Sequence, residues 1–318
     1  GSGSSPLILI DGIEGDLNSV NPNDIENVSV LKDAASASIY GARAAFGVIL
    51  VTTKSGKSGK AKVSYNGNVR FSDALCVPEM MDSYQFALYF NRAAENAGDS
   101  GPFSQEALDR ILAYQAGTLK ETMTMNEQTR KWQAYGGANA NTDWFKETLK
   151  PWSPQTYANA TIDGGTDNMT YFVSVSAKTQ DGFYRNSGTK YNQYDLKSNL
   201  DLKLNKYINL FMNLTGRMED RKYPTRSSEN IFRMLMRSKP NMPAYWPNGL
   251  PGPDIEFGDN PVVIATDATG YERDKRYILN GDFGVNINVP YVEGLTLKAT
   301  ASLDKNFRFR KIWQTPWT

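Results

Sequence analysis

Seven segments after residue 60 alternate apolar and polar side chains at every second position. In residues 194–204, for example, a face of Tyr, Leu and Ser alternates with a face of Asp, Lys and Asn. A period of two places successive side chains on opposite faces of a β-strand. The segments are residues 63–71, 171–178, 194–204, 208–215, 279–289 and 295–304, with a weaker one at 157–162. The chain is therefore expected to be mostly β.

The length of these segments separates two kinds of β-protein. The strands that contain them are expected to run for about 10 to 14 residues, whereas strands of soluble proteins have about 5–6. A strand that crosses a bilayer needs about 9–11 residues, with one face toward lipid and a polar face toward the lumen. The mean hydropathy of −0.51 is compatible with such strands, because only alternate residues face lipid. We predict a transmembrane antiparallel β-barrel; a soluble sandwich would show the same alternation and is the alternative fold.

Aromatic residues near the ends of the predicted strands fit the same interpretation. Interfacial belts of aromatic side chains flank the lipid-facing band of outer-membrane barrels. The residues expected in such belts are Tyr157, Tyr171, Tyr191, Tyr207, Tyr277, Phe307, Phe309, Trp313 and Trp317.

The connections between the predicted strands are unequal. Short turns are expected at 186–188, 205–206 and 290–294, whereas residues 75–155 and 221–274 are long excursions. The first excursion contains two helix-like stretches, 83–97 and 104–114. Short turns on one side and long loops on the other are typical of outer-membrane barrels, and long ordered loops often carry function. The long loops are expected to form the extracellular mouth.

The first 57 residues have a different pattern. Apolar runs at 7–10, 28–31 and 46–53 indicate three strands. Asn23 or Asp24 is expected to cap a short helical turn, and Asp33 a helix over 34–40 that ends at Gly41. A glycine-rich polar joint follows at 54–60. We therefore expect a small α+β unit at 1–57 and the first part of the barrel at 58–318.

The composition excludes several classes of function. The chain has no histidine and one cysteine, Cys76, which excludes histidine-dependent nucleophilic catalysis, histidine-ligated zinc and disulfide frameworks. Its net charge of +1 gives no sign of nucleic-acid binding. Asp11, Glu14 and Asp16 lack the spacing of an EF-hand, so no metal is expected. No cofactor and no enzymatic activity are predicted; a glycosidase with paired carboxylates is the weakest hypothesis.

Aromatic residues in the long loops are the candidates for ligand contact. Flat aromatic faces bordered by amides can dock sugars or peptides. The candidate residues are Trp144, Trp152, Tyr245, Trp246 and Asn248. The alternative is that these side chains hold their own loops in place.

Two stretches of the N-terminal unit resemble a known family. Pro6-Leu-Ile-Leu-Ile-Asp-Gly12 and the segment 25–54 are similar to the end of the plug domain in SusC/RagA-type TonB-dependent outer-membrane transporters. Supporting similarity extends through Asn141-Thr-Asp-Trp144, Gly164-Gly165, residues 171–176 and Asp259-Asn-Pro261. The resemblance implies a barrel of about 22 strands with the plug inside it. It also implies that this chain, with about seven predicted strands and no signal peptide, is an internal fragment of a larger protein.

The same resemblance implies a function. Such proteins import nutrients across the outer membrane of Gram-negative, Bacteroidetes-type bacteria. The implied partners are a SusD-like surface lipoprotein that acts as a lid, TonB with its inner-membrane motor, outer-membrane lipid, and an oligosaccharide (glycan) or peptide ligand. The alternative function is an extracellular β-rich carbohydrate-binding or adhesin-like module.

Overall fold

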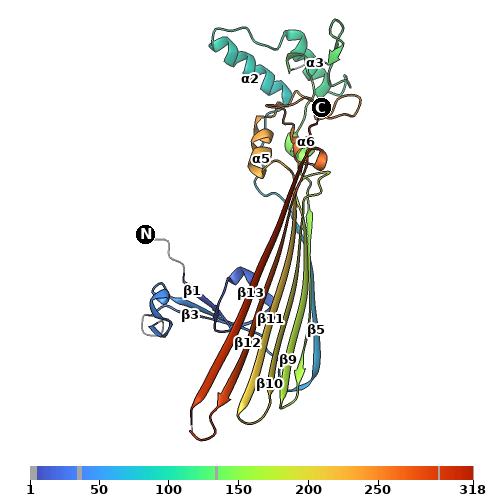
Figure 1. Cartoon of the computed structure of the whole chain (residues 1–318). Coiled ribbons are helices and arrows are strands. Elements are labelled where there is room, and N and C mark those ends of the chain that lie inside the picture. The colour runs from blue at the N-terminus through green and yellow to red at the C-terminus, as the bar shows by residue number, and fades with distance from the viewer. Residues whose placement is uncertain (1–5, 34–37, 133–134, 293, 318) are drawn as a thin grey trace.

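The computed structural model describes residues 6–33, 38–132, 135–292 and 294–317. A long seven-stranded sheet, here called the wall, carries a small four-stranded sheet against one face (Figure 1). The helices gather at one end of the wall in a region here called the cap, residues 73–152 and 224–269 (Figure 1). Among the described residues, no helix is long and apolar enough to cross a bilayer.

The wall confirms the predicted strands and their faces. Its strands pair in the order β13-β12-β11-β10-β9-β8-β5, each antiparallel to its neighbours. Leu196, Gly216 and Leu279 lie opposite one another on the outward face, and Asp195 lies opposite Arg217 on the inward face. The strands are β5 (Gly59–Ser72), β8 (Ser153–Gly165), β9 (Met169–Asp181), β10 (Lys190–Lys203), β11 (Ile208–Tyr223), β12 (Gly270–Asn288) and β13 (Thr296–Gln314).

The wall is one open sheet, and its inward face is polar. Lys197 and Asn199 are buried on that face beneath the small sheet. A sandwich would instead need two sheets with a dry apolar interior. The barrel-type fold is therefore the correct alternative. Tyr157 and Tyr191 also point inward, where they bond Asn21 and Glu219, so their expected place in an outer aromatic belt is wrong.

Three strands are longer than the alternation predicted. β11 has 16 residues, and β12 and β13 have 19 each. Their additional residues carry charges on both faces, so no apolar period marks them. Cross-strand pairs hold them together, including Arg273 on Asp220 and Arg308 on Asp274. The second long excursion is therefore shorter than expected, because residues 221–223 belong to β11 and 270–274 to β12. The first loses residues 153–155 to β8.

The small sheet has the order β2-β1-β4-β3, and β1 runs parallel to β4. Its core contains Leu7, Leu9, Ala44 and Val48. The elements are β1 (Leu7–Ile10), β2 (Ile13–Glu14), β3 (Ile25–Leu31), β4 (Val48–Thr53) and the 3-10 helices η1 (Leu17–Ser19), η2 (Pro22–Asp24) and η3 (Ser38–Ala44).

Two local predictions in this unit are wrong. The cap of η2 is Asn21, whose side chain accepts from the Asn23 N–H, because Pro22 occupies the first helical position. Gly41 does not end the next helical segment: its φ of 72° makes a kink, and 3-10 turns continue to Ala44. Residues 34–37 of the predicted helix lie outside the described residues.

The cap folds around its own apolar core. Trp144, Phe145, Ile231, Met234 and Ile264 are buried there together, so both long excursions contribute to one body. Its elements are α2 (Ser83–Asn96), α3 (Gln105–Gln115), β6 (Met125–Asn126), β7 (Lys131–Trp132), η4 (Tyr135–Gly137), α4 (Trp144–Thr148), α5 (Ser228–Arg237), α6 (Pro261–Ile264) and η5 (Asp267–Thr269). At the opposite end of the wall lie the short connections between β8 and β9, between β10 and β11, and between β12 and β13, together with the segment 54–58 that joins β4 to β5 (Figure 1).

Candidate functional site: the contact between the small sheet and the wall

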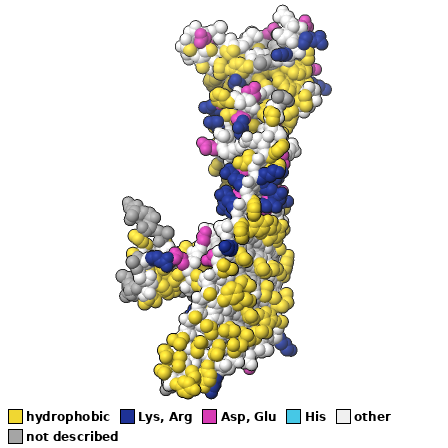
Figure 2. All heavy atoms as spheres, viewed as in Figure 1, with side chains coloured by type: hydrophobic (Ala, Val, Ile, Leu, Met, Phe, Trp, Pro, Cys, Tyr) yellow, Lys and Arg dark blue, Asp and Glu magenta, His cyan; other side chains and the backbone are white. Residues whose placement is uncertain are grey.

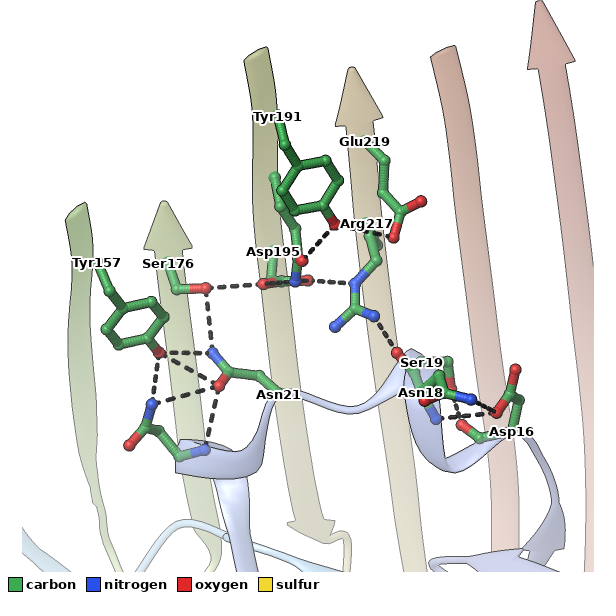
Figure 3. Close-up of polar contacts among 12 residues, drawn as sticks. Asp16, Asn18, Ser19, Asn21, Tyr157, Ser176, Tyr191, Asp195, Arg217 and Glu219 are labelled. Carbon is green, nitrogen blue, oxygen red and sulfur yellow. Dashed lines mark hydrogen bonds and ion pairs between the residues drawn. The ribbon is translucent and has the colours of Figure 1, made fainter. Parts of the chain in front are cut away.

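The small sheet meets the wall through side-chain amides and hydroxyls (Figure 3). The Asn21 amide donates to the Tyr157 hydroxyl on β8 and to the Ser176 hydroxyl on β9, each at 3.0 Å. The Asn23 amide donates to the same Tyr157 hydroxyl at 2.7 Å. Asn21 also caps η2, so one residue both begins the turn and attaches it to the wall.

A guanidinium continues this contact along the wall (Figure 3). Arg217 on β11 donates to the Asp195 carboxylate at 2.6 Å and also to the Asn18 carbonyl in η1. Asp195 accepts from Ser176 as well, at 2.9 Å. The side chains of three neighbouring strands are therefore linked in one network that reaches the small sheet at Asn18 and Asn21.

A buried ion pair forms a second contact. The Lys197 ammonium, 5% exposed, lies 3.7 Å from an oxygen of Asp11. Asp11 has a φ of 52° at the turn between β1 and β2, and its carboxylate accepts from the Thr53 N–H at 2.8 Å. Asn199, two residues after Lys197 on the same face of β10, donates to the Lys54 carbonyl at 2.7 Å.

The arrangement separates apolar packing from attachment. The apolar core of the small sheet contains residues of that sheet alone. Between it and the wall lies a gap lined by polar groups that include Glu14, Asn213, Asn280, Asp282 and Asp304. Water can replace side-chain hydrogen bonds at modest cost, whereas separating apolar surfaces exposes them to water. The small sheet can therefore leave the wall without losing its own core.

The five candidate ligand-contact residues of the long loops differ in how far the structure buries them. Trp144 is 4% exposed in the cap core, and its indole N–H donates to the Lys239 carbonyl at 2.9 Å. Trp152, by contrast, is 64% exposed at the start of β8, with a φ of 59°.

Tyr245, Trp246 and Asn248 lie together in one turn of the cap. Trp246 stacks on Trp132, with ring centroids 6.2 Å apart. The Asn248 side chain accepts from the Leu250 N–H at 3.1 Å, and Tyr245 is 39% exposed. Asn248 thus shapes the turn, while Tyr245 and Trp152 present free surface. Whether any of the five contacts a ligand stays a prediction.

Sequence reasoning missed the residues that attach the small sheet. Asn21 was not among the expected caps, Arg217 lay beyond the predicted strand 208–215, and Lys197 and Asn199 were predicted only as part of a polar strand face. The available signal was weak: Lys197 and Asn199 are alternate residues of one strand, but nothing in the sequence identifies their partner. Among the described residues, no group of three or more carboxylate or thiol side chains could hold a metal ion.

Comparisons with known proteins agree with this geometry. Residues 1–48 match the family model described as the TonB-dependent Receptor Plug Domain. The chain is 28% identical to the TonB-dependent receptor SusC of Bacteroides thetaiotaomicron over 91% of its length, and 31% identical to the TonB-dependent receptor P26 of Formosa agariphila over 63%. The solved structure of the RagAB peptide importer in its closed-closed state superposes on 97% of the chain with a TM-score of 0.71 at 24% identity. The predicted resemblance to SusC/RagA-type TonB-dependent receptors is confirmed.

The receptor chain spans only part of these relatives. It covers 28% of SusC, 18% of P26 and 35% of the superposed RagAB chain. The family places it in the outer membrane. The small sheet is accordingly called the plug from here on, and the inward face of the wall faces the lumen.

One buried carboxyl group of the plug lacks a hydrogen-bond partner for one of its oxygens. Asp24, 2% exposed at the end of η2, has one carboxylate oxygen without a hydrogen-bond partner. Burial raises the pKa of Asp24, although a hydrogen bond with Ser174 and the charges of Lys197 and Lys54 act in the opposite direction. Burial in the docked plug therefore makes the ionised form of this side chain less favourable than it is in water.

Plug docking is expected to depend on pH through Asp24. A solvent-exposed Asp has a pKa of about 3.9. Because docking raises this pKa, the contribution of Asp24 is fully present below that value and is lost as the pH rises through the raised pKa. Asp24→Asn, which cannot ionise, should slow amide exchange of the plug about five-fold at neutral pH, since burying one carboxylate oxygen without a hydrogen-bond partner costs about 1 kcal/mol.

The measurement is hydrogen exchange of residues 7–53 in the full-length receptor between about pH 5 and about pH 8, corrected for intrinsic exchange rates. Asp16→Asn is the control, because Asp16 caps η1 at an exposed position. Equal protection of the plug in the wild type and in Asp24→Asn across this range would contradict the assignment.

Proposed function

We propose that this receptor imports a nutrient across the outer membrane with energy delivered through TonB. In this proposal residues 1–57 are the C-terminal part of the plug domain, and residues 58–318 are the N-terminal part of the barrel. The observation that carries it is the polar attachment of a plug that keeps its own core. No catalytic residue is required for this function and none is assigned.

Such import requires a plug that stays bound to the wall at rest and can leave it under a pulling force. Buried amide and ionic contacts stabilise the docked position, because each bond lost in a dry site costs about 1–3 kcal/mol. Once a pulling force opens the contact, water can satisfy the same groups. A plug fixed by interlocked apolar side chains would expose its core on moving and would tend to unfold.

The proposed partners are TonB, with its inner-membrane motor, and a SusD-like lipoprotein that closes over the cap. Large apolar side chains remain exposed on the cap, among them Leu75 at 96% and Phe257 at 84%. Exposed apolar surface of this kind is typical of a protein interface. The similarity to SusC and to RagAB supports a partner at this end of the wall.

The proposed ligand is an oligosaccharide or a peptide, bound between the plug and the lid. Trp152 and Tyr245 are the exposed aromatic candidates for its contact, while Trp246 and Asn248 support the turn that carries Tyr245. One relative is described as a peptide importer, which favours neither ligand here because the loops differ between proteins.

A reversible cross-link tests whether plug movement is required. Thr53 in the plug and Asn199 in the wall lie with side-chain atoms 3.5 Å apart. We expect that Thr53→Cys with Asn199→Cys, in a Cys76→Ser background and joined by a short reducible thiol cross-linker, lowers nutrient uptake to the level of cells without TonB. Reduction should restore uptake.

The matched control joins two strands of the wall. The Thr296 hydroxyl on β13 donates to the Asn288 side chain on β12 at 3.0 Å, so Asn288→Cys with Thr296→Cys accepts the same cross-linker away from the plug contacts described above. Uptake should persist in this control. Full uptake in the cross-linked plug variant would overturn the proposed function.

A further inference from the structure

The outward face of the wall has an apolar hollow near its cap end. Gly216 on β11 has no side chain to fill the surface, and a Cβ placed there would approach no atom closer than 3.9 Å. Large apolar side chains from four adjacent strands surround it. They are Tyr194, Leu196, Met218, Tyr277, Leu279 and Phe307. This hollow, here called the groove, opens on the face that lies against lipid.

Directly beyond the groove, the same face changes from apolar to basic. On β11 the next outward residues after Met218 are Asp220 and Lys222; on β12 those beyond Tyr277 are Lys275 and Arg273. On β10 and β13 the change brings Lys190 and Lys311 to the same level. Figure 2 shows this band of Lys and Arg above the hydrophobic surface of the wall. These five cations are here called the basic cluster.

The basic cluster keeps an excess of positive charge. Arg273 binds Asp220 through two nitrogens, Lys222 lies 2.5 Å from Asp267, and Lys190 lies 3.9 Å from Asp181. Lys311 makes no ion pair with any described residue, and its ammonium lies over the Tyr271 ring, as does that of Lys222. A second hollow among Lys190, Lys222 and Arg273 opens beside these groups.

The two hollows match the two parts of one lipid. Outward residues two positions apart on a strand are separated by about 7 Å, so the cations begin one such step beyond the groove. An acyl chain would bind in the groove, and a phosphate would bind the cations. A neutral lipid would use the groove alone, and a free phosphate would use the cations alone. Basic pockets at the edge of an apolar band commonly bind anionic headgroups.

We propose that the groove and the basic cluster form a binding site for a phosphorylated glycolipid of the outer leaflet. One acyl chain lies against Gly216, and a headgroup phosphate binds Lys222, Lys311 and Arg273. The site is on the opposite face of the wall from the plug contacts and does not depend on the proposed import function.

Native mass spectrometry of the full-length receptor in detergent tests this assignment, with bisphosphorylated lipid A as the probe. We expect Lys222→Gln with Lys311→Gln to weaken lipid A binding at least about ten-fold, while leaving the Arg273–Asp220 pair intact. Gly216→Leu should weaken it about five-fold by filling the groove with a side chain that lipid tolerates.

The matched controls change charge or bulk elsewhere. Lys203→Gln with Lys206→Gln removes two exposed cations near the opposite end of the wall, and Ala301→Leu adds an outward apolar side chain away from the groove. Both should bind lipid A as the wild type does. Three results would each overturn the proposal: unchanged binding in both test variants, equal binding of dephosphorylated lipid A, or inorganic phosphate binding as tightly as the lipid.

Discussion

Lys197→Met is expected to release the plug from the wall. The Lys197 ammonium is buried beside Asp11, and Asp24 and Asp282 also lie within its electrostatic reach. Methionine fills a similar volume but removes the only charge that balances Asp11 at this contact among the described residues. Leaving a buried ion without its partner costs about 3–5 kcal/mol. The docked state should therefore become a minor one.

A released plug has a direct consequence in cells. The barrel lumen would open to large hydrophilic solutes, so cells carrying Lys197→Met should become sensitive to an antibiotic such as vancomycin, and TonB-dependent uptake should fall. Lys197→Arg keeps the charge and should retain most of the docking. Lys203→Met, on the same face of β10 but exposed, is the matched control. Cells with Lys197→Met that remain as resistant as the wild type would show that the ion pair does not hold the plug.

Trp144→Ala is expected to destabilise the cap by about 3–5 kcal/mol, the usual cost of deleting a large buried aromatic side chain. The indole packs among residues of both long excursions and donates to the Lys239 carbonyl, so its loss also removes one of the two hydrogen bonds that this carbonyl accepts, the other coming from the Met242 N–H. Limited proteolysis of the full-length receptor should then cut within residues 224–269 many times faster. Ligand affinity would then fall only indirectly, because the cap loops that carry the candidate contact residues lose their fold.

Two substitutions separate packing from ligand contact. Trp144→Phe keeps most of the apolar volume and should lose only about 1–2 kcal/mol. Tyr245→Ala removes an exposed ring from the same region and should leave the proteolysis rate unchanged. If Trp144→Ala lowers ligand affinity with no change in proteolysis, Trp144 contacts the ligand and the packing role is wrong.

The strands of the wall could be predicted because their two faces meet different solvents. Lipid on one side and water on the other impose a strict period of two, which is visible in residues 194–204 or 279–289. The predicted strands ended too early where the contrast between lipid and water ends. Residues 220–223 and 270–275 lie beyond the apolar band, and their cross-strand ion pairs leave no period in the sequence.

The contacts of the inward face could not be predicted in the same way. Asn21 and Tyr157 are 136 residues apart, and Lys197 and Asp11 are also distant in the chain, so neither pair could be matched from the sequence. A hydrogen bond needs a donor and an acceptor at one point in space, and a polar residue alone does not say where its partner lies. Trp144 was uncertain for a related reason: an aromatic residue in a loop can pack or bind.

By itself, the sequence determined the class of the protein: long strands with a lipid face, a small unit of different pattern before them, no histidine and a single cysteine. Only the tertiary structure decided which polar residues hold the plug, which aromatic side chains are buried in the cap, and where cations meet an apolar groove on the outer face. The physical reason is that strand periodicity is a local response to solvent. Ion pairs, hydrogen-bond networks and binding surfaces arise only when distant segments are brought together.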